Sequence, residues 1–294
     1  MFKIIEKTKI WFSISLAIIL VGVVLMATRG LNFGIDFKGG TKIVVDFGKD
    51  FDKVEADKIV KEYAEDAATK VVEKTQYEIK STKLDETSTS ELFDALKEKF
   101  SLEDKALVSQ TLIGPTIGKE LTRNAVIAVV VACIAMLIYI AIRFEFKFGI
   151  AAILALVHDV LITLAVYAIF DIPVNNSFIA AMLTIVGYSI NDTIVVFDRI
   201  RENSKKMRRS TPTEIANTSI NKTLARTINT SLTTLIIIGA VNIFVPTVRE
   251  FSFPLLVGIA AGAYSSIFIA SPIWVLLKER NKKVNTAYGL YEYI

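Results

Sequence analysis

The stretch GYSINDTIVVFDRIR, residues 187–201, decides how this chain folds, because it places a carboxylate inside an otherwise apolar run. A carboxylate near the middle of a membrane-spanning helix costs roughly 2.5–3.5 kcal/mol on translocon-insertion scales. Chains that keep such a group use it to move ions or protons, or pair it with another buried polar group. Asp192 therefore predicts a membrane protein whose other helices hold this residue within the bilayer.

Apolar runs of spanning length surround this stretch. Hydrophobic residues make up 52% of the 294-residue chain, and about 20 apolar residues in a helix cross a hydrocarbon core of about 30 Å. The runs are 10–28, 124–142, 148–170, 177–197, 227–245 and 253–277. The first could be a cleaved signal peptide, but it is longer than the apolar part of such a peptide and ends in a poor cleavage site. We therefore expect an α-helical polytopic protein with six transmembrane helices, the first within residues 1–29 and the others within 124–277.

Residues 30–123 form a long polar segment between the first two runs and predict a small α+β domain. The pattern LNFGIDFKGGTKIVVDF is typical of extended structure with a turn at Gly39-Gly40. Amphipathic helices are predicted at 52–68 and 89–100, and strands at 69–81 and 106–113. Strands that alternate with two helices favour a ferredoxin-like arrangement.

Lysine and arginine are distributed unevenly among the loops, which predicts the orientation. They precede the first span, fill the loop 198–226 and recur in the tail 278–294. The loops on the opposite side, 171–176 and 246–252, hold only Arg249. By the positive-inside rule we expect both termini in the cytoplasm and residues 30–123 outside the cytoplasmic membrane.

Within the loop 198–226, Thr211-Pro212-Thr213-Glu214 has the spacing of a capping box with proline at the first helical position. This predicts a helix from about 212 to 224 that lies along the inner membrane surface. The basic residues beside it fit contact with anionic membrane lipid better than contact with a protein. Because the positive charge follows the spans, the net charge of +4 is no indication of nucleic-acid binding.

Two polar stripes on consecutive spans predict a coupling site. Polar residues share one face of the fourth span: Thr184, Tyr188, Asn191 and Asp192. Polar residues also share one face at the start of the fifth span: Arg226, Asn229, Thr230, Thr233 and Thr234. We expect Asp192 and Arg226 to be partners across a hydrated seam. Two alternatives stay open: Arg226 could snorkel to the cytoplasmic interface, and Asp192 could serve only as a hydrogen-bonding group.

The charge on a carboxylate in a low dielectric depends on how close an arginine lies. Protonation of Asp192 should therefore release Arg226 and let the two helices move. The coupling ion could be H⁺ or Na⁺, since a carboxylate beside asparagine and threonine oxygens suits either.

Other polar and small residues in the spans are less specific. His158 and Asp159 in the third span, with Thr230 and Thr233, make a possible secondary polar site, for which transport and helix packing are equally open. Gly187 and the pair Gly258 and Gly262 predict close approach of neighbouring helices.

Three motifs lie in a fixed order along the chain: LNFGIDFKGGT (31–41), IGPTIGKEL (113–121) and VGYSINDTIVVFDRIREN (186–203). Together they resemble the SecF family of protein-export membrane proteins, in the resistance-nodulation-division superfamily. The resemblance implies a complex with SecD that associates with the SecYEG translocon and uses the proton motive force to promote late export of a preprotein, after the ATPase SecA has acted. In that family the acidic residue of the third motif and the arginine that opens the fifth span are implicated in proton conduction, and they match Asp192 and Arg226. A SecD-like half is missing, so we expect the separate-subunit form, with half of the paired bundle supplied by another chain.

Two further functions stay open on the sequence: a proton-coupled small-molecule exporter of the same superfamily, and a purely structural scaffold for SecD. Residues 30–123 are a small domain for building a drug-sized pocket, which disfavours the exporter. The sequence has no phosphate-binding loop, metal-ligand cluster or nucleophile–base arrangement. We therefore expect neither an enzyme nor a cofactor or metal site.

Overall fold

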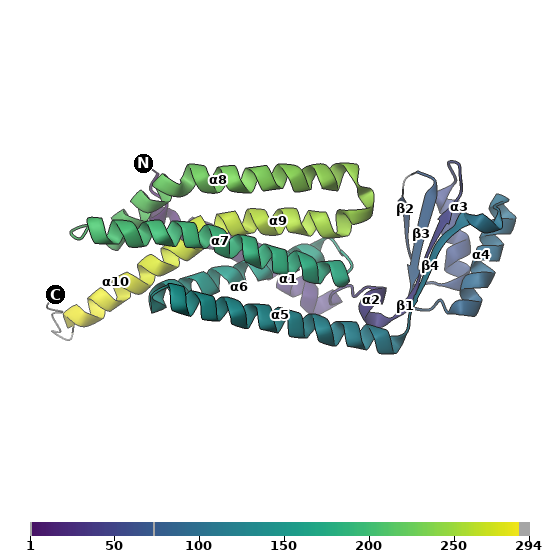
Figure 1. The fold of residues 1–294 in the computed structure, drawn as a ribbon, viewed down its shortest axis with the longest axis horizontal. Helices are drawn as coiled ribbons and strands as arrows, with labels where there is room; N and C mark the ends of the chain where they lie inside the picture. The colour runs from purple at the N-terminus through teal and green to yellow at the C-terminus, as the bar shows by residue number, and fades with distance from the viewer. Residues whose placement is uncertain (1, 73, 288–294) are drawn as a thin grey trace.

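The computed structural model describes residues 2–72 and 74–287. A long bundle of helices carries a four-stranded sheet with its own two helices at one end (Figure 1). Residues 288–294 of the expected tail 278–294 lie outside the described residues.

The bundle is built from apolar helices: α1 (Thr8–Arg29), α5 (Pro115–Arg143), α6 (Phe146–Ile169), α7 (Asn176–Lys206), α8 (Pro212–Phe244), α9 (Arg249–Ser265) and α10 (Ser271–Ala287). A π-helical turn (Ser266–Ala270) joins the last two, and short 3-10 turns precede α1 (Ile5–Lys7) and α9 (Pro246–Val248). Within the described part of the chain, six helical segments are long and apolar enough to cross a membrane. The prediction of a polytopic protein with six spans is therefore confirmed.

The boundaries expected for the loop 198–226 differ from those in the structure. Helix α7 continues to Lys206 and α8 begins at Pro212, so only residues 207–211 lie outside helices. The capping box forms as predicted, since Thr211 Oγ1 accepts from the Glu214 amide at 3.2 Å and the Glu214 carboxylate accepts from the Thr211 amide at 3.0 Å. The helix that starts there runs on into the fifth span, because no glycine or proline interrupts it before Gly239.

The sheet has the strand order β2-β3-β1-β4, with every neighbouring pair antiparallel. Its strands are β1 (Gly40–Asp46), β2 (Ala68–Val72), β3 (Gln76–Ser81) and β4 (Leu107–Ile113), the last preceded by a 3-10 turn (Asp104–Ala106). Helix α3 (Lys53–Tyr63) connects β1 to β2, and α4 (Glu86–Phe100) connects β3 to β4. Both helices cover one face of the sheet and bury residues such as Ile43, Tyr77 and Leu92 (Figure 1).

Two local predictions for this segment need correction. The single strand expected at 69–81 is a hairpin, β2–β3, whose turn contains Lys74 in a left-handed conformation with φ of 64°. The extended stretch expected after the first span contains a short helix, α2 (Ile35–Lys38). Gly40 follows it with φ of 143°, and a Cβ there would lie 2.3 Å from the Ser81 carbonyl oxygen, so only glycine fits this entry into β1.

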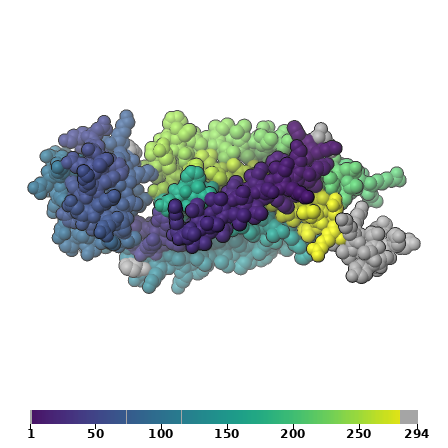
Figure 2. Space-filling model, turned by 180° about the vertical axis from the view of Figure 1, so that it is seen from behind, coloured from purple at the N-terminus to yellow at the C-terminus, as the bar shows by residue number. Residues whose placement is uncertain are grey.

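Small residues set the distance between the spanning helices. Helix α1 lies along the surface of the bundle (Figure 2), where Gly22 lies so close to Ala165 of α6 that a Cβ would lie 2.2 Å from the alanine Cβ. Gly258 and Gly262 of α9 pack against α7, as the sequence predicts. Gly187 differs from that expectation, because nothing lies within 4 Å of where its Cβ would be.

Gly22→Ala is expected to destabilise the bundle, because Ala165 presents backbone as well as side chain to the new methyl group. Overpacking of this kind costs about 1–3 kcal/mol, and thermal unfolding of the purified chain in detergent would measure it. Gly187→Ala is the matched control, since its methyl group meets open space. Equal melting temperatures for the two variants would contradict the assignment of Gly22 to a tight helix contact.

Candidate functional site

Asp192 lies on α7 at the junction with α8. Its side chain is partly buried, and its Oδ2 accepts a hydrogen bond of 3.1 Å from the Ser231 hydroxyl on α8. Ser231 is itself buried. The carboxylate predicted from the sequence is therefore held at a helix–helix contact within the spanning region.

Arg226 lies on the neighbouring helix but forms no ion pair with Asp192 among the described residues. Its guanidinium is exposed and within electrostatic reach of the carboxylate. Arg226 precedes Ser231 by five residues, which places it about 7.5 Å nearer the Pro212 end of α8. The structure thus brings the two predicted partners onto adjoining helices, while the direct partner of Asp192 is a serine.

The other residues of the two polar stripes face outward. Tyr188 is 44% exposed, and Asn191 is exposed as well. On α8, Thr230 and Thr233 are exposed, and their hydroxyls donate to main-chain carbonyls of their own helix at 2.9 Å. We call this outward surface of α7 and α8 the polar strip: Tyr188, Asn191, Arg226, Asn229, Thr230 and Thr233.

Asp159 lies at the centre of a second, fully buried polar network. Its Oδ1 lies 2.8 Å from His158 Nδ1, and its Oδ2 accepts from Ser189 of α7 at 2.5 Å and from Ser265 of α9 at 2.7 Å. The carboxylate has no exposed surface. A carboxylate in such a place requires several donors, because an unpaired buried charge is strongly unfavourable.

The network continues from His158 to α1. His158 Nε2 lies 2.8 Å from the Ser15 hydroxyl, and Ser15 lies 3.4 Å from the Tyr264 hydroxyl. Tyr264 donates at 2.8 Å to the main-chain oxygen of Trp11. Side chains from α1, α6, α7 and α9 are therefore joined by one set of hydrogen bonds in the interior of the bundle.

The structure separates the residues of the expected secondary site. His158 and Asp159 are interior, whereas Thr230 and Thr233 lie on the polar strip, and no hydrogen bond in the described ranges joins the two pairs. The structure does not bring this group together, because Thr230 lies on α8 beside the α7–α8 contact, while Asp159 contacts Ser189 of α7 and Ser265 of α9.

Sequence reasoning missed the serines that complete both sites: Ser15, Ser189, Ser231 and Ser265. Each is a single small polar residue in an apolar run. The available signal was position: Ser189 precedes Asp192 by three residues, and Ser265 follows Gly262 by three.

The far end of α7 carries an ion cluster outside these networks. Asp198 lies 2.9 Å from Arg143 Nη2 and 2.8 Å from Arg201 Nη2. All three side chains are about one-third exposed, so this cluster belongs to the end of the bundle. In the described ranges, no group of three or more histidine, cysteine, aspartate or glutamate residues could hold a metal ion.

Comparison with known proteins places these sites in a family. The family described as "Protein export membrane protein SecD/SecF, C-terminal" matches residues 93–280, and "SecD/SecF GG Motif" matches residues 24–50. The Protein translocase subunit SecF of Sebaldella termitidis is 40% identical over 289 residues, which cover 95% of this chain and 93% of that protein. The Protein translocase subunit SecDF of Bacillus subtilis is 37% identical over 96% of this chain, which spans 39% of that longer protein.

Comparison with solved structures gives the same family relationship. The crystal structure of SecDF, a translocon-associated membrane protein from Thermus thermophilus, superposes with a TM-score of 0.82 at 37% identity. The match covers 95% of this chain and 39% of that structure. The motif residues 31–41 and the α7 stretch around Asp192 lie within the two matched family regions. This chain therefore belongs to the SecD/SecF family of protein-export membrane proteins.

Proposed function

We propose that this chain is an accessory subunit of the Sec protein translocase, which works with SecD and uses the proton motive force to promote late steps of preprotein export. The observation that carries the proposal is Asp192, a partly buried carboxylate on a spanning helix, held by Ser231 beside the polar strip. A carboxylate in a membrane span is expensive and is kept where a proton or an ion must bind.

The partner assignment rests on the relatives and on the surface of α7 and α8. In Bacillus subtilis and Thermus thermophilus the similar sequence is part of a longer protein named SecDF. The polar strip faces outward within two spanning helices, where lipid would offer no hydrogen-bond partner to the side chains of Arg226, Asn191 and Tyr188. Helices of SecD packed over this strip would satisfy them and enclose the path to Asp192.

Within this site, Asp192 takes up and releases the coupling proton, and Arg226 supplies the charge that responds to it. Asn191 and Tyr188 line the approach from the strip. A proton that crosses the membrane contributes about 2.3 kcal/mol per 100 mV, which is more than the 1.4 kcal/mol that changes an equilibrium tenfold. Na⁺ is the alternative coupling ion, and the experiment below distinguishes the two.

The same proposal includes the topology. Both termini are cytoplasmic, and residues 30–123 form a ferredoxin-like domain outside the membrane, between the first span and the bundle 124–277. Two features support this: the sheet lies at the end of the bundle away from the α7–α8 connection (Figure 1), and residues 199–209, which end in that connection, include six lysines and arginines. The order β1-α3-β2-β3-α4-β4 with antiparallel neighbours supports the ferredoxin-like assignment. SecYEG with SecA, the preprotein and anionic lipid are the remaining partners.

Export by a reconstituted complex of this chain, SecD, SecYEG and SecA tests the function. We expect an imposed proton gradient to increase the yield of completed export several-fold over ATP alone, and an equal sodium gradient at uniform pH to have no effect. Stimulation by sodium alone would identify Na⁺ as the coupling ion. Equal export with and without this chain, under either gradient, would contradict the proposed function.

A further inference from the structure

The outer end of α7 is capped by a residue from a distant part of the chain. Asn175 occupies the N-cap position, but its side chain makes no capping hydrogen bond. Instead the main-chain amide of Asn176 donates to Asp36 Oδ2 at 2.8 Å. Asp36 belongs to α2, the short helix that leads into β1. A carboxylate at this position satisfies one free amide and stabilises the positive end of the helix.

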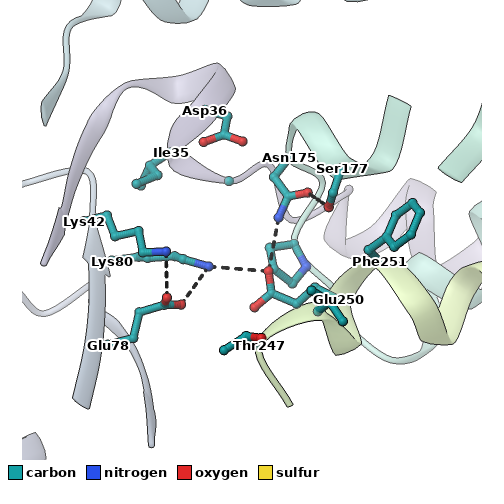
Figure 3. Close-up of a pocket in the computed structure, with 13 residues that line it drawn as sticks. Ile35, Asp36, Lys42, Glu78, Lys80, Asn175, Ser177, Thr247, Glu250 and Phe251 are labelled. Carbon is teal, nitrogen blue, oxygen red and sulfur yellow. Dashed lines mark hydrogen bonds and ion pairs between the residues drawn. The ribbon is translucent and has the colours of Figure 1, made fainter. Parts of the chain in front are cut away.

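The side chain of Asn175 is used to join α7 to α9. Its Nδ2 donates to Glu250 Oε2 at 3.1 Å, and its Oδ1 accepts from Ser177 at 2.5 Å (Figure 3). Glu250 is the second residue of α9. The first turns of two spanning helices are therefore connected through one carboxylate.

The same carboxylate connects both helices to the sheet. Lys80 Nζ of β3 lies 3.4 Å from Glu250 Oε2 and 3.0 Å from Glu78 Oε1, and Lys42 of β1 pairs with Glu78 at 2.8 Å (Figure 3). Burial lowers the pKa of Lys80, but the charges of Glu250 and Glu78 outweigh it and hold that pKa above its ordinary value. Burial raises the pKa of Glu78, but Lys42 and Lys80 outweigh it and hold that pKa below its ordinary value. Lys80 and Glu78 therefore stay charged at neutral pH.

Main-chain contacts strengthen the connection. The residues before α2 run beside the α6–α7 loop, where Gly34 donates to the Val174 oxygen at 2.8 Å and Val174 donates to the Asn32 oxygen at 2.7 Å. Lys70 of β2 donates to the Pro246 oxygen before α9 at 2.9 Å. A cavity of about 260 Å³ lies between the sheet and the helix ends, and polar side chains from both parts line it. We call these contacts the joint: Asp36, Lys80, Asn175 and Glu250.

Helices α7 and α9 form one packed unit from the joint inward. Gly258 and Gly262 of α9 lie against Ile185 and Ser189 of α7. Ser189 also shares the Asp159 carboxylate with α9. Asp192 follows Asn176 by sixteen residues in one continuous helix, about 24 Å along its axis.

We propose that Asp36, Asn175 and Glu250 are positioning residues for the coupling site, which fix the outer ends of α7 and α9 to the sheet so that a movement of α7 at Asp192 turns the sheet domain. This inference rests on the proposed function, because it takes Asp192 as the group whose protonation moves α7. On this proposal, the residues around Gly39-Gly40 transmit the movement of α7 to the sheet domain at the outer membrane surface.

Hydrogen–deuterium exchange of the full chain in complex with SecD tests the joint directly. Asp36→Ala should accelerate exchange in the first turn of α7 about tenfold, in line with the loss of a helix cap. Asp36→Asn keeps an acceptor oxygen and should stay near wild type. Lys83→Met is the control, because Lys83 pairs with Glu65 inside the sheet domain at 3.2 Å. Wild-type exchange in Asp36→Ala would overturn the capping contact.

The transmission is tested with the coupling residue itself. In the intact joint, Asp192→Asn should change exchange in β3, and in the Asp36→Ala background that change should disappear. Lys80→Glu and Glu250→Lys should each reduce gradient-dependent export at least threefold, and the double exchange should restore most of it. Persistence of the β3 response without Asp36, or no rescue by the double exchange, would overturn the proposal.

Failure of the proposed function would look different. In that case the Asp192→Asn complex would export normally under a proton gradient, while Asp36→Ala would still accelerate exchange in α7. That pair of results would leave the joint as a structural contact and overturn its role in transmission.

Discussion

Asp192→Asn is expected to reduce gradient-dependent export to the level measured without a gradient, while the complex with SecD still assembles. Asparagine has nearly the same shape as aspartate, and its amide oxygen can still accept from Ser231, which contacts Asp192 at 3.1 Å. It cannot take up or release a proton at physiological pH. The substitution therefore removes the titration and keeps the α7–α8 contact.

The measurement is export yield by the reconstituted translocase with and without an imposed proton gradient, beside co-purification of SecD. Asp198→Asn is the matched control, because it makes the same chemical change six residues, or about 9 Å, further along α7. Asp198 lies in the ion cluster with Arg143 and Arg201 at the end of the bundle, so its loss should leave most of the gradient response. A normal response in Asp192→Asn would exclude a proton-carrying role for this residue.

The spans could be predicted from the sequence because one physical length governs them. The thickness of the hydrocarbon core requires about 20 apolar residues per helix, and the chain meets that requirement in six described segments. The ends of those helices were less predictable. Helix α7 continues through charged residues to Lys206 because Ile200 and Asn203 are buried there, and Asn203 donates to Ser219 of α8 at 2.7 Å. The length of an apolar run gives no information on this polar contact between two helices.

The helices and strands of residues 30–123 could also be predicted only in part. Amphipathic spacing predicted α3 and α4, since each buries one face against the sheet. The β2–β3 hairpin was not separated into two strands, because its turn around Lys74 contains no glycine or proline that would mark it. The left-handed residue in that turn is a lysine, which the usual turn preferences do not predict.

At the candidate site, the carboxylates in the spans could be predicted from the sequence, but the side chains that contact them could not. A carboxylate in an apolar run is conspicuous because of its cost, so Asp192 and Asp159 stand out. The serines that bind them are common in membrane helices, where they often donate to their own main chain. Whether Ser231 turns to Asp192 depends on the approach of α8, which the sequence does not contain. For the same reason, only the fold shows that Ser231, and not Arg226, contacts Asp192 directly.

Asp159→Ala is expected to destabilise the bundle by about 2–5 kcal/mol. The lower figure reflects interhelical hydrogen bonds in membranes, which average about 0.6 kcal/mol each, together with lost packing. The upper figure reflects the donors that would be left buried without an acceptor, each of which costs about 1–3 kcal/mol. His158, Ser189 and Ser265 would all lose the carboxylate they now contact, and α1, α6, α7 and α9 would lose their common junction. Thermal unfolding of the purified chain in detergent measures this loss, and wild-type stability would contradict it.

Asp159→Asn then separates the two functions that the sequence leaves open for this pair. The amide oxygen can accept from Ser189 and Ser265 in place of Oδ2, so we expect a smaller loss of stability than in Asp159→Ala. If the network only fixes α7 against α1, α6 and α9, gradient-dependent export should follow stability and stay near wild type. A stable Asp159→Asn chain that lost the gradient response would instead show that Asp159 carries a proton. We expect the first result, because Asp159 is fully buried and its network with His158 already joins four helices, whereas the polar strip beside Asp192 is exposed on the surface of the bundle.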